Sequence, residues 1–212
     1  MALHTRDQAP REGKAPAQRP VSNWKPGRGE YLLFLRDSFE VYEAFEDIIN
    51  DTKDFEALRD TGLERTSALK KDFQWFKSQY NIQTPQCGQP GEAYATFLRN
   101  LAKEGEAEVG GESSASNWKP KFICHYYNHY FAHTAGGRMI GKKMGDMLLD
   151  SHTLEFYKWE SCDVRKAMEA VKGTIDEMAE GWGEEEREEC LRETKNTFKY
   201  AGGLLSYMRG PV

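Results

Sequence analysis

Apolar residues recur every three or four positions along most of the chain, which is the spacing that places them on one face of a helix. This pattern predicts helices over Glu30–Asp51, Thr61–Tyr80, Tyr94–Leu101, Val164–Trp182 and Glu184–Met208. Lys121–His133 is aromatic and apolar on several sides, as a buried helix is, so we expect a helix there too. Runs of alternating β-branched residues, which are typical of strands, are absent. We therefore expect an all-α fold, with residues 1–212 forming a single multi-helix domain.

Two stretches lack this periodicity and are predicted to be loops. Pro10–Gly29 is rich in Pro and Gly, and Gly105–Pro120 contains Gly-Gly and Ser-Ser-Ala-Ser, so we expect the second to be a flexible surface loop. The first would separate a short terminal segment, residues 1–9, from the helical part of the chain.

The composition excludes several classes of protein. With 12% aromatic residues the chain is too hydrophobic to be disordered, yet no apolar run approaches the roughly 18 residues that span a bilayer. Met1–Arg11 contains no secretory signal, and a net charge of −5 argues against a nucleic-acid binder with a basic surface. The cysteines are scattered without a C-x-x-C pair, so we expect free thiols in a reducing compartment.

The charges are distributed unevenly along the chain. No acidic residue occurs between Glu112 and Asp146, whereas acidic residues gather around Glu184–Glu189. The acid-free stretch is either a solvated face or a surface that meets an anion or an acidic partner, and charge alone leaves both interpretations open.

Three histidines follow one another at four-residue intervals inside the acid-free stretch, at positions 125, 129 and 133. On a helix they share one face, and His-x3-His is a known arrangement for binding zinc or another divalent metal. The neighbouring tyrosines make this an aromatic core helix, so the histidines are equally explained as partners in buried hydrogen bonds. A metal site at His125, His129 and His133 is therefore one alternative.

A glycine pair, Gly136 and Gly137, follows the last histidine in an otherwise helical pattern. Each glycine costs a helix about 1 kcal/mol relative to alanine, so the pair is either a simple helix break or a place where backbone passes close to a flat ligand. In the second case His133 and Arg138 would face that ligand. His4 stands alone near the N-terminus and would act as a ligand only if the terminal segment docks on the core.

Several motifs resemble those of the plant and algal haem oxygenases, in the same order and over nearly the whole chain. They are Leu3-His4-Thr5-Arg6-Asp7-Gln8-Ala9, Thr61-Gly62-Leu63-Glu64-Arg65, Phe73–Phe76, Phe122–Lys143, Leu154–Trp159 and Phe198-Lys199-Tyr200. The most specific run continues from Tyr127-Asn128 through Phe131-Ala132-His133 to Ala135-Gly136-Gly137-Arg138-Met139-Ile140-Gly141.

This resemblance implies that haem lies between a proximal helix and a kinked distal helix. His4 would be the proximal ligand of the haem iron. The distal helix would kink at Gly136 and Gly137 and press its backbone on the haem face. His133 would order the distal water network, at a position where other branches of the family carry an acidic residue.

The resemblance also implies roles for residues around the haem edge. Tyr127 would lie near one propionate and Lys172 near the other. Tyr42 and Phe198 would line the wall of the pocket.

The chemistry implied is the oxidative cleavage of haem to biliverdin IXα, CO and Fe²⁺, with haem as both cofactor and substrate and with O2 as the oxidant. Reduced ferredoxin, an acidic protein, would supply the electrons, and we hypothesise that it docks on Arg138, Lys142 and Lys143. The product would feed bilin and phytochrome chromophore synthesis, with a bilin reductase as a possible downstream partner. We expect a monomer in the plastid stroma, as a mature form without its transit peptide.

Two alternatives remain open beside this enzyme. One is a protein of the same fold that holds haem or another tetrapyrrole without turnover. The other is the helical metal protein that would use the three histidines.

Overall fold

The computed structural model describes residues 23–107 and 118–209, and these segments are helical without any strand. The α-helices are α1 (Arg28–Asp51), α2 (Thr66–Tyr80), α3 (Gln89–Ala107), α4 (Trp118–Ala132), α5 (Arg138–Leu148), α6 (Val164–Glu180) and α7 (Glu184–Leu204). Shorter turns are the 3-10 elements η2 (Lys53–Leu58), η5 (Glu155–Tyr157) and η6 (Leu205–Arg209), and the π-helical turn η4 (His133–Gly137). The all-α prediction is confirmed.

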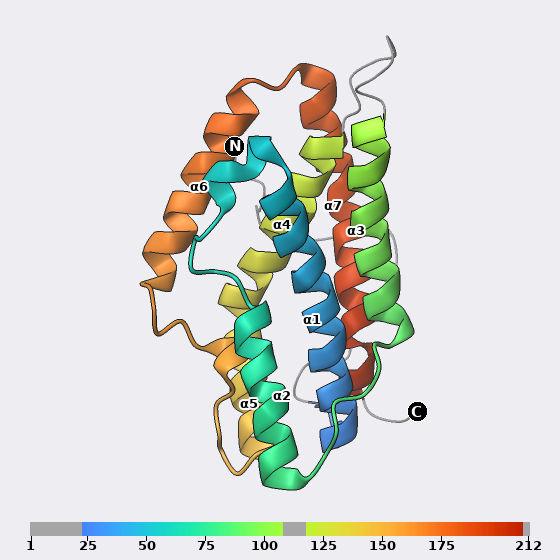
Figure 1. The fold of residues 1–212 in the computed structure, drawn as a ribbon, viewed down its shortest axis with the longest axis vertical. Helices are drawn as coiled ribbons and strands as arrows, with labels where there is room; N and C mark the ends of the chain where they lie inside the picture. The colour runs from blue at the N-terminus through green and yellow to red at the C-terminus, as the bar shows by residue number, and fades with distance from the viewer. Residues whose placement is uncertain (1–22, 108–117, 210–212) are drawn as a thin grey trace.

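Four long helices form the centre of the molecule (Figure 1). α1 packs along α3, and α4 packs along α7, with further contacts between α3 and α4. α6 contacts α4, and α2 packs beside α1 and against η5. α1 is buried along much of its length because its apolar residues Tyr31, Leu35, Tyr42, Phe45 and Ile49 follow helical spacing.

The start of α2 differs from the sequence prediction. The helix begins at Thr66 and not at Thr61. Gly62 has a φ of +80°, which a helix does not accept, and the carboxylate of Glu46 on α1 accepts hydrogen bonds from the backbone N–H groups of Arg65 and Thr66 at 2.7 and 3.1 Å. This cap comes from a residue far away in the chain, so local periodicity could not place it.

Both predicted loops are shorter than expected. α1 already begins at Arg28, α3 continues to Ala107, and α4 starts at Trp118. The indole of Trp118 lies in the space where a Cβ on Gly105 would stand, so the two helices meet closely at the ends that flank the second loop. Residues 23–27 of the first predicted loop are described and precede α1. Residues 10–22 and 108–117 of the predicted loops, and the terminal segment 1–9 with His4, lie outside the described residues.

All four cysteines are free thiols, as predicted, and two of them, Cys124 and Cys190, are buried. Within the described residues, none of the helices has the length and apolar character needed to cross a bilayer.

Candidate functional site

The helix that carries the three histidines does not break at the glycine pair. Residues 133–137 form one π-helical turn, and α5 continues directly from Arg138. A π turn inserts one extra residue into the helix, and such turns are frequent at functional sites. The predicted interruption is therefore present, as a change of helical register and without an end to the helix.

The two glycines of this turn lie in different surroundings. A Cβ on Gly137 would stand 2.6 Å from Nδ1 of His133, so the missing side chain makes room for the imidazole. A Cβ on Gly136 would meet nothing within 4 Å among the described residues. Gly137 is thus required by packing within the chain, whereas the side of Gly136 is open.

Further glycines continue the close packing along α5. A Cβ on Gly141 would stand 2.5 Å from the ring of Tyr157, and one on Gly145 would stand 2.6 Å from the carbonyl oxygen of His152. The segment that leads into η5 therefore lies directly on the backbone of α5.

Among the described residues, the imidazole of His133 makes a hydrogen bond through only one of its two nitrogens. Its Nε2 lies 2.9 Å from the carbonyl oxygen of Phe156, and its ring stacks on the Phe156 ring at 4.1 Å. A carbonyl oxygen only accepts, so Nε2 carries the proton. Burial lowers the pKa of His133 to about 3, and the positive charge of Arg65 contributes to this shift. The imidazole is therefore neutral near pH 7, and its Nδ1 has no hydrogen-bond partner among the described residues.

The tyrosine ring beside His133 carries a buried hydroxyl that has no hydrogen-bond partner among the described residues. The ring of Tyr42 packs edge-on against the His133 ring at 5.9 Å, and the side chain is 1% exposed. Its Oη makes no hydrogen bond within the described part of the chain. Burial raises the pKa of Tyr42 well above its usual value, so the hydroxyl stays protonated and can donate. A buried donor of this kind calls for a water molecule or a ligand.

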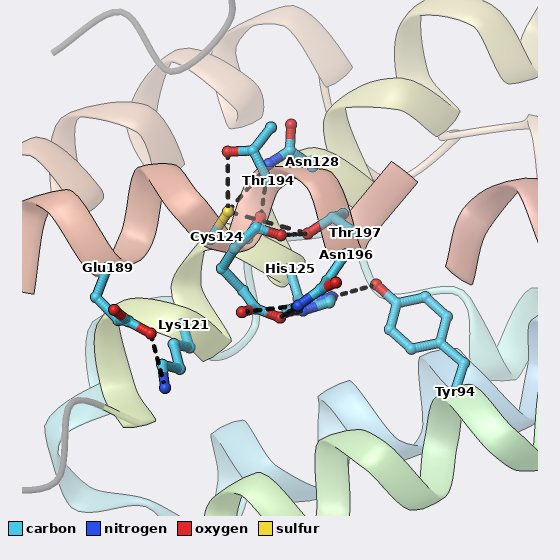
Figure 2. A network of polar contacts seen from close by, with 10 residues as sticks. Tyr94, Lys121, Cys124, His125, Asn128, Glu189, Thr194, Asn196 and Thr197 are labelled. Carbon is cyan, nitrogen blue, oxygen red and sulfur yellow. Dashed lines mark hydrogen bonds and ion pairs between the residues drawn. The ribbon is translucent and has the colours of Figure 1, made fainter. Parts of the chain in front are cut away.

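His125, two turns earlier, has a hydrogen-bond partner at both ring nitrogens (Figure 2). Its Nδ1 lies 2.9 Å from the Tyr94 hydroxyl and its Nε2 lies 2.9 Å from Oε1 of Glu193. Burial lowers the pKa of His125, so the neutral ring donates from Nε2 to the carboxylate and accepts from Tyr94. His129 packs against the rings of Tyr42, Phe45 and Tyr94.

The three-histidine metal site is not formed in the described segments. No three His, Cys, Asp or Glu side chains there are placed to hold a metal ion together. The alternative of buried hydrogen bonding is confirmed for His125 and His133.

The predicted docking residues share one surface of α5, although in the sequence they are only part of a long basic stretch. Two adjoining hollows of about 470 and 400 Å³ have Met139, Lys142 and Asp146 in common. Lys143 lines the first hollow and Arg138 the second. Met139 is 71% exposed, and Met147 is exposed as well, so the surface combines positive charge with apolar side chains.

Other lysines of the acid-free stretch are paired within the molecule. Lys119 forms an ion pair with Asp54, and Lys121 with Glu189 at 2.9 Å. The acidic cluster predicted around Glu184–Glu189 therefore neutralises part of the basic stretch. Lys142 also pairs with Asp146 at 3.0 Å, on the exposed surface of α5.

Residues 23–206 match the family model for "Heme oxygenase". The chain belongs to the haem oxygenase family. It is 43% identical to "Heme oxygenase 1, chloroplastic" of Oryza sativa over 98% of this chain and 68% of that protein. It is 41% identical to the Arabidopsis thaliana protein of the same name, over 97% of this chain and 69% of that protein.

The family also contains relatives with a different description. The chain is 35% identical to "Probable inactive heme oxygenase 2, chloroplastic" of Oryza sativa, over 86% of this chain and 51% of that protein. Solved haem oxygenases share the fold. Heme oxygenase-1 of Synechocystis in complex with heme has a TM-score of 0.66 at 18% identity, covering 88% of this chain and 79% of that one.

The remaining haem oxygenase residues predicted from the sequence lie on three different helices. Tyr127 on α4 is buried, stacks on Phe131 at 4.1 Å, and has a raised pKa because of burial and the nearby charge of Asp176 on α6. Lys172 is exposed on α6, one turn before Asp176. Phe198 on α7 is 38% exposed.

Sequence reasoning missed two residues that act on His133. They are Phe156, which supplies the carbonyl acceptor, and Asp72, whose carboxylate accepts from the backbone of the same turn at 2.8 Å. The hydrogen bond of Phe156 comes from its backbone carbonyl, for which the sequence has no signal. Asp72 occupies the apolar face of α2 between Leu69 and Phe76, and a carboxylate at that position is a visible departure from the pattern.

Proposed function

We propose that this chain is a ferredoxin-dependent haem oxygenase that cleaves haem to biliverdin IXα, CO and Fe²⁺. The observation that carries the proposal is the polar arrangement beside the π turn. On the helix that carries Gly136, a neutral His133, whose Nδ1 has no hydrogen-bond partner among the described residues, packs against the ring of Tyr42. The buried hydroxyl of Tyr42 likewise has no partner there. An acceptor and a donor of this kind suit a site that holds ordered water against a reacting ligand.

Haem fits the residues of this site. In the proposal His4 binds the iron from the proximal side, and the backbone at Gly136 approaches the distal face. The open side of Gly136 has room for such an approach. Haem supplies iron and the porphyrin carbon that is oxidised by O2, while the chain holds the ring, orders water and limits which carbon reacts.

The same proposal assigns the edge of the haem to three helices. Tyr127 and Lys172 would contact the two propionates, and Phe198 would form part of the wall. Tyr42 has a double role, because its ring belongs to the wall and its hydroxyl is available to the water held by His133.

Electron delivery is assigned to the surface of α5. Arg138, Lys142 and Lys143 would attract an acidic ferredoxin, and the exposed Met139 and Met147 would supply apolar contact once it has docked. The acid-free stretch has two further lysines, Lys119 and Lys121, and both pair with acidic residues outside α5. The Lys142–Asp146 pair lies on the exposed surface of α5, where solvent weakens it, so Lys142 can still meet an acidic partner.

Relatives named chloroplastic support a plastid location, for which we propose the stroma. There the chain would act as a monomer and pass biliverdin to a bilin reductase. The free cysteines are compatible with a reducing compartment.

A turnover assay separates this proposal from the alternative of a non-catalytic haem carrier of the same fold. Relatives named "Probable inactive heme oxygenase 2" give a reason to test that alternative. One equivalent of haemin is added to the protein, followed by reduced ferredoxin and O2. We expect the Soret band to decay while a biliverdin band grows and CO is released. A stable Soret band without bile pigment would show that the chain binds haem and does not cleave it.

The proximal ligand is tested in the same assay. His4→Ala should abolish turnover, and external imidazole should restore it, because imidazole can occupy the vacated iron position. Full activity of the variant without imidazole would exclude His4 as the ligand.

A further inference from the structure

We infer that Asp72 is a positioning residue for His133: by holding the η5 turn, it keeps the imidazole in the tautomer that is protonated at Nε2 and leaves Nδ1 as a hydrogen-bond acceptor. The inference deepens the proposed function and rests on it, since it concerns the residue proposed to order the distal water.

The first step is the contact between His133 and η5. The carbonyl oxygen of Phe156 lies 2.9 Å from Nε2, and the Phe156 ring stacks on the imidazole with an interplanar angle of 24°. One residue therefore fixes the ring plane and the protonated nitrogen together. If the carbonyl turned away, nothing in the described residues would favour one neutral tautomer over the other.

The second step is the anchoring of η5 by α2. Oδ1 of Asp72 accepts from the backbone N–H of Glu155 at 2.8 Å, and Oδ2 accepts from that of Phe156 at 2.8 Å. These two N–H groups open a 3-10 turn of three residues, which has no internal partner for them. Asp72 is 1% exposed, so water does not replace the carboxylate. Asp72 thus holds the two peptide groups that precede the Phe156 carbonyl. The carbonyl's own peptide group is tied within the turn, because the N–H of Tyr157 donates to the carbonyl of Leu154 at 3.1 Å. One buried side chain therefore fixes Phe156 from the side opposite His133.

The third step is the consequence for the distal side. A neutral imidazole whose N–H is committed to a carbonyl has only a lone pair to offer at Nδ1. Water bound there would donate one hydrogen to His133 and keep its other hydrogen for the haem side. His133 would then orient water and would not itself release a proton.

The test compares two buried aspartates that have the same local task. Asp72→Asn replaces one carboxylate oxygen by an amide group that cannot accept from a backbone N–H. Asp37→Asn is the matched control, since Asp37 accepts from the N–H groups of Gly88 and Gly91 at 2.6 and 2.8 Å but lies away from η5. Proton–nitrogen NMR spectra of isotopically labelled histidine rings, recorded without haem, report the tautomer directly.

We expect His133 to be protonated at Nε2 in the unsubstituted protein and in Asp37→Asn. In Asp72→Asn a population protonated at Nδ1 should appear, while the signals of His125, held by Glu193, stay unchanged. With haem and ferredoxin, turnover of Asp72→Asn should fall about tenfold relative to the control, as is typical for loss of an outer-shell partner.

Either of two results overturns the inference. One is an Nδ1-protonated His133 in the unsubstituted protein, and the other is an unchanged tautomer in a folded Asp72→Asn. Neither result depends on turnover, so a failure of the proposed haem cleavage is recognised separately.

If Asp72→Asn does not fold, a second pair of variants tests the same inference. Glu155→Pro removes one of the two N–H groups that Asp72 holds, at the first position of η5, where proline is tolerated. Glu155→Ala removes the same side chain and keeps the N–H group. The Nδ1-protonated population should appear with proline only, and its absence from both variants would contradict the role of Asp72.

Discussion

Two histidines on one continuous helix, His125 and His133, have the same tautomer but differ in how many of their ring nitrogens are hydrogen-bonded. Both donate from Nε2, His125 to the Glu193 carboxylate and His133 to the Phe156 carbonyl. The Nδ1 of His125 accepts from the hydroxyl of Tyr94, whereas that of His133 meets no partner in the described segments. The ring of Tyr42 packs against His133, and its buried hydroxyl has no partner in those segments either. The regular four-residue spacing thus includes two histidines with different roles. His125 connects α3, α4 and α7 through hydrogen bonds, whereas His133 keeps Nδ1 available to bind water or a ligand.

The largest effect expected from this difference is a separation of stability from activity. His125→Ala should lower the free energy of unfolding by about 3 kcal/mol, because the buried Glu193 and Tyr94 both lose their partner. His133→Ala should cost only about 1 kcal/mol but reduce haem turnover by at least about tenfold. Urea unfolding and ferredoxin-driven turnover measure the two quantities. Equal losses of stability in the two variants would contradict the comparison.

The two glycines of the π turn sharpen the comparison further. Gly137→Ala places a Cβ against His133 Nδ1 and should destabilise the protein by about 1–3 kcal/mol through overpacking, with a loss of turnover. Gly136→Ala meets no described atom and should stabilise the haem-free protein by about 0.5–1 kcal/mol, as alanine is the better helix former. Thermal unfolding without haem gives the sign, and destabilisation by Gly136→Ala would show that this side is already filled.

Acidification tests the neutral state of His133. Its pKa is about 6.5 in the unfolded chain and about 3 in the folded one, so the unfolded chain binds more protons between these values and stability falls as the pH is lowered. Between about pH 7.5 and pH 5.5, the unsubstituted protein should therefore lose about 1 kcal/mol more than His133→Asn does. His129, which burial shifts to about 3 as well, remains in both proteins and cancels. Parallel losses in the two proteins would mean that His133 is not held neutral.

The smallest effect concerns the surface of α5. Lys142→Glu with Lys143→Glu should slow ferredoxin-driven turnover several-fold at low ionic strength, and the difference should shrink as salt is added. Lys103→Glu is the matched control, an exposed lysine on α3, which lies across the molecule from α5 (Figure 1). Turnover with a small chemical reductant should be equal in all variants. A salt-independent loss, or an equal loss in the control, would remove α5 as the docking surface.

The sequence was sufficient for the fold class because apolar residues follow helical spacing in α1, α2, α3 and α6. It also placed His133 and the glycine pair in one interruption of the helix. The sequence could not show which distant residue would pair with each polar group. Glu46 caps α2, and Phe156 holds His133, through contacts between segments that are far apart in the chain. The shift of the helix start from Thr61 to Thr66 has the same cause. His4, the residue with the most specific expectation, lies outside the described residues.

The close packing of η5 on α5 limits which substitutions the sequence can accept in evolution. The ring of Tyr157 occupies the place of a Cβ on Gly141, so a larger residue at 141 is compatible only with a smaller one at 157. Divergent relatives should therefore change these two positions together or neither of them. Positions 141 and 157, which are far apart in the chain but in contact in the fold, would therefore covary.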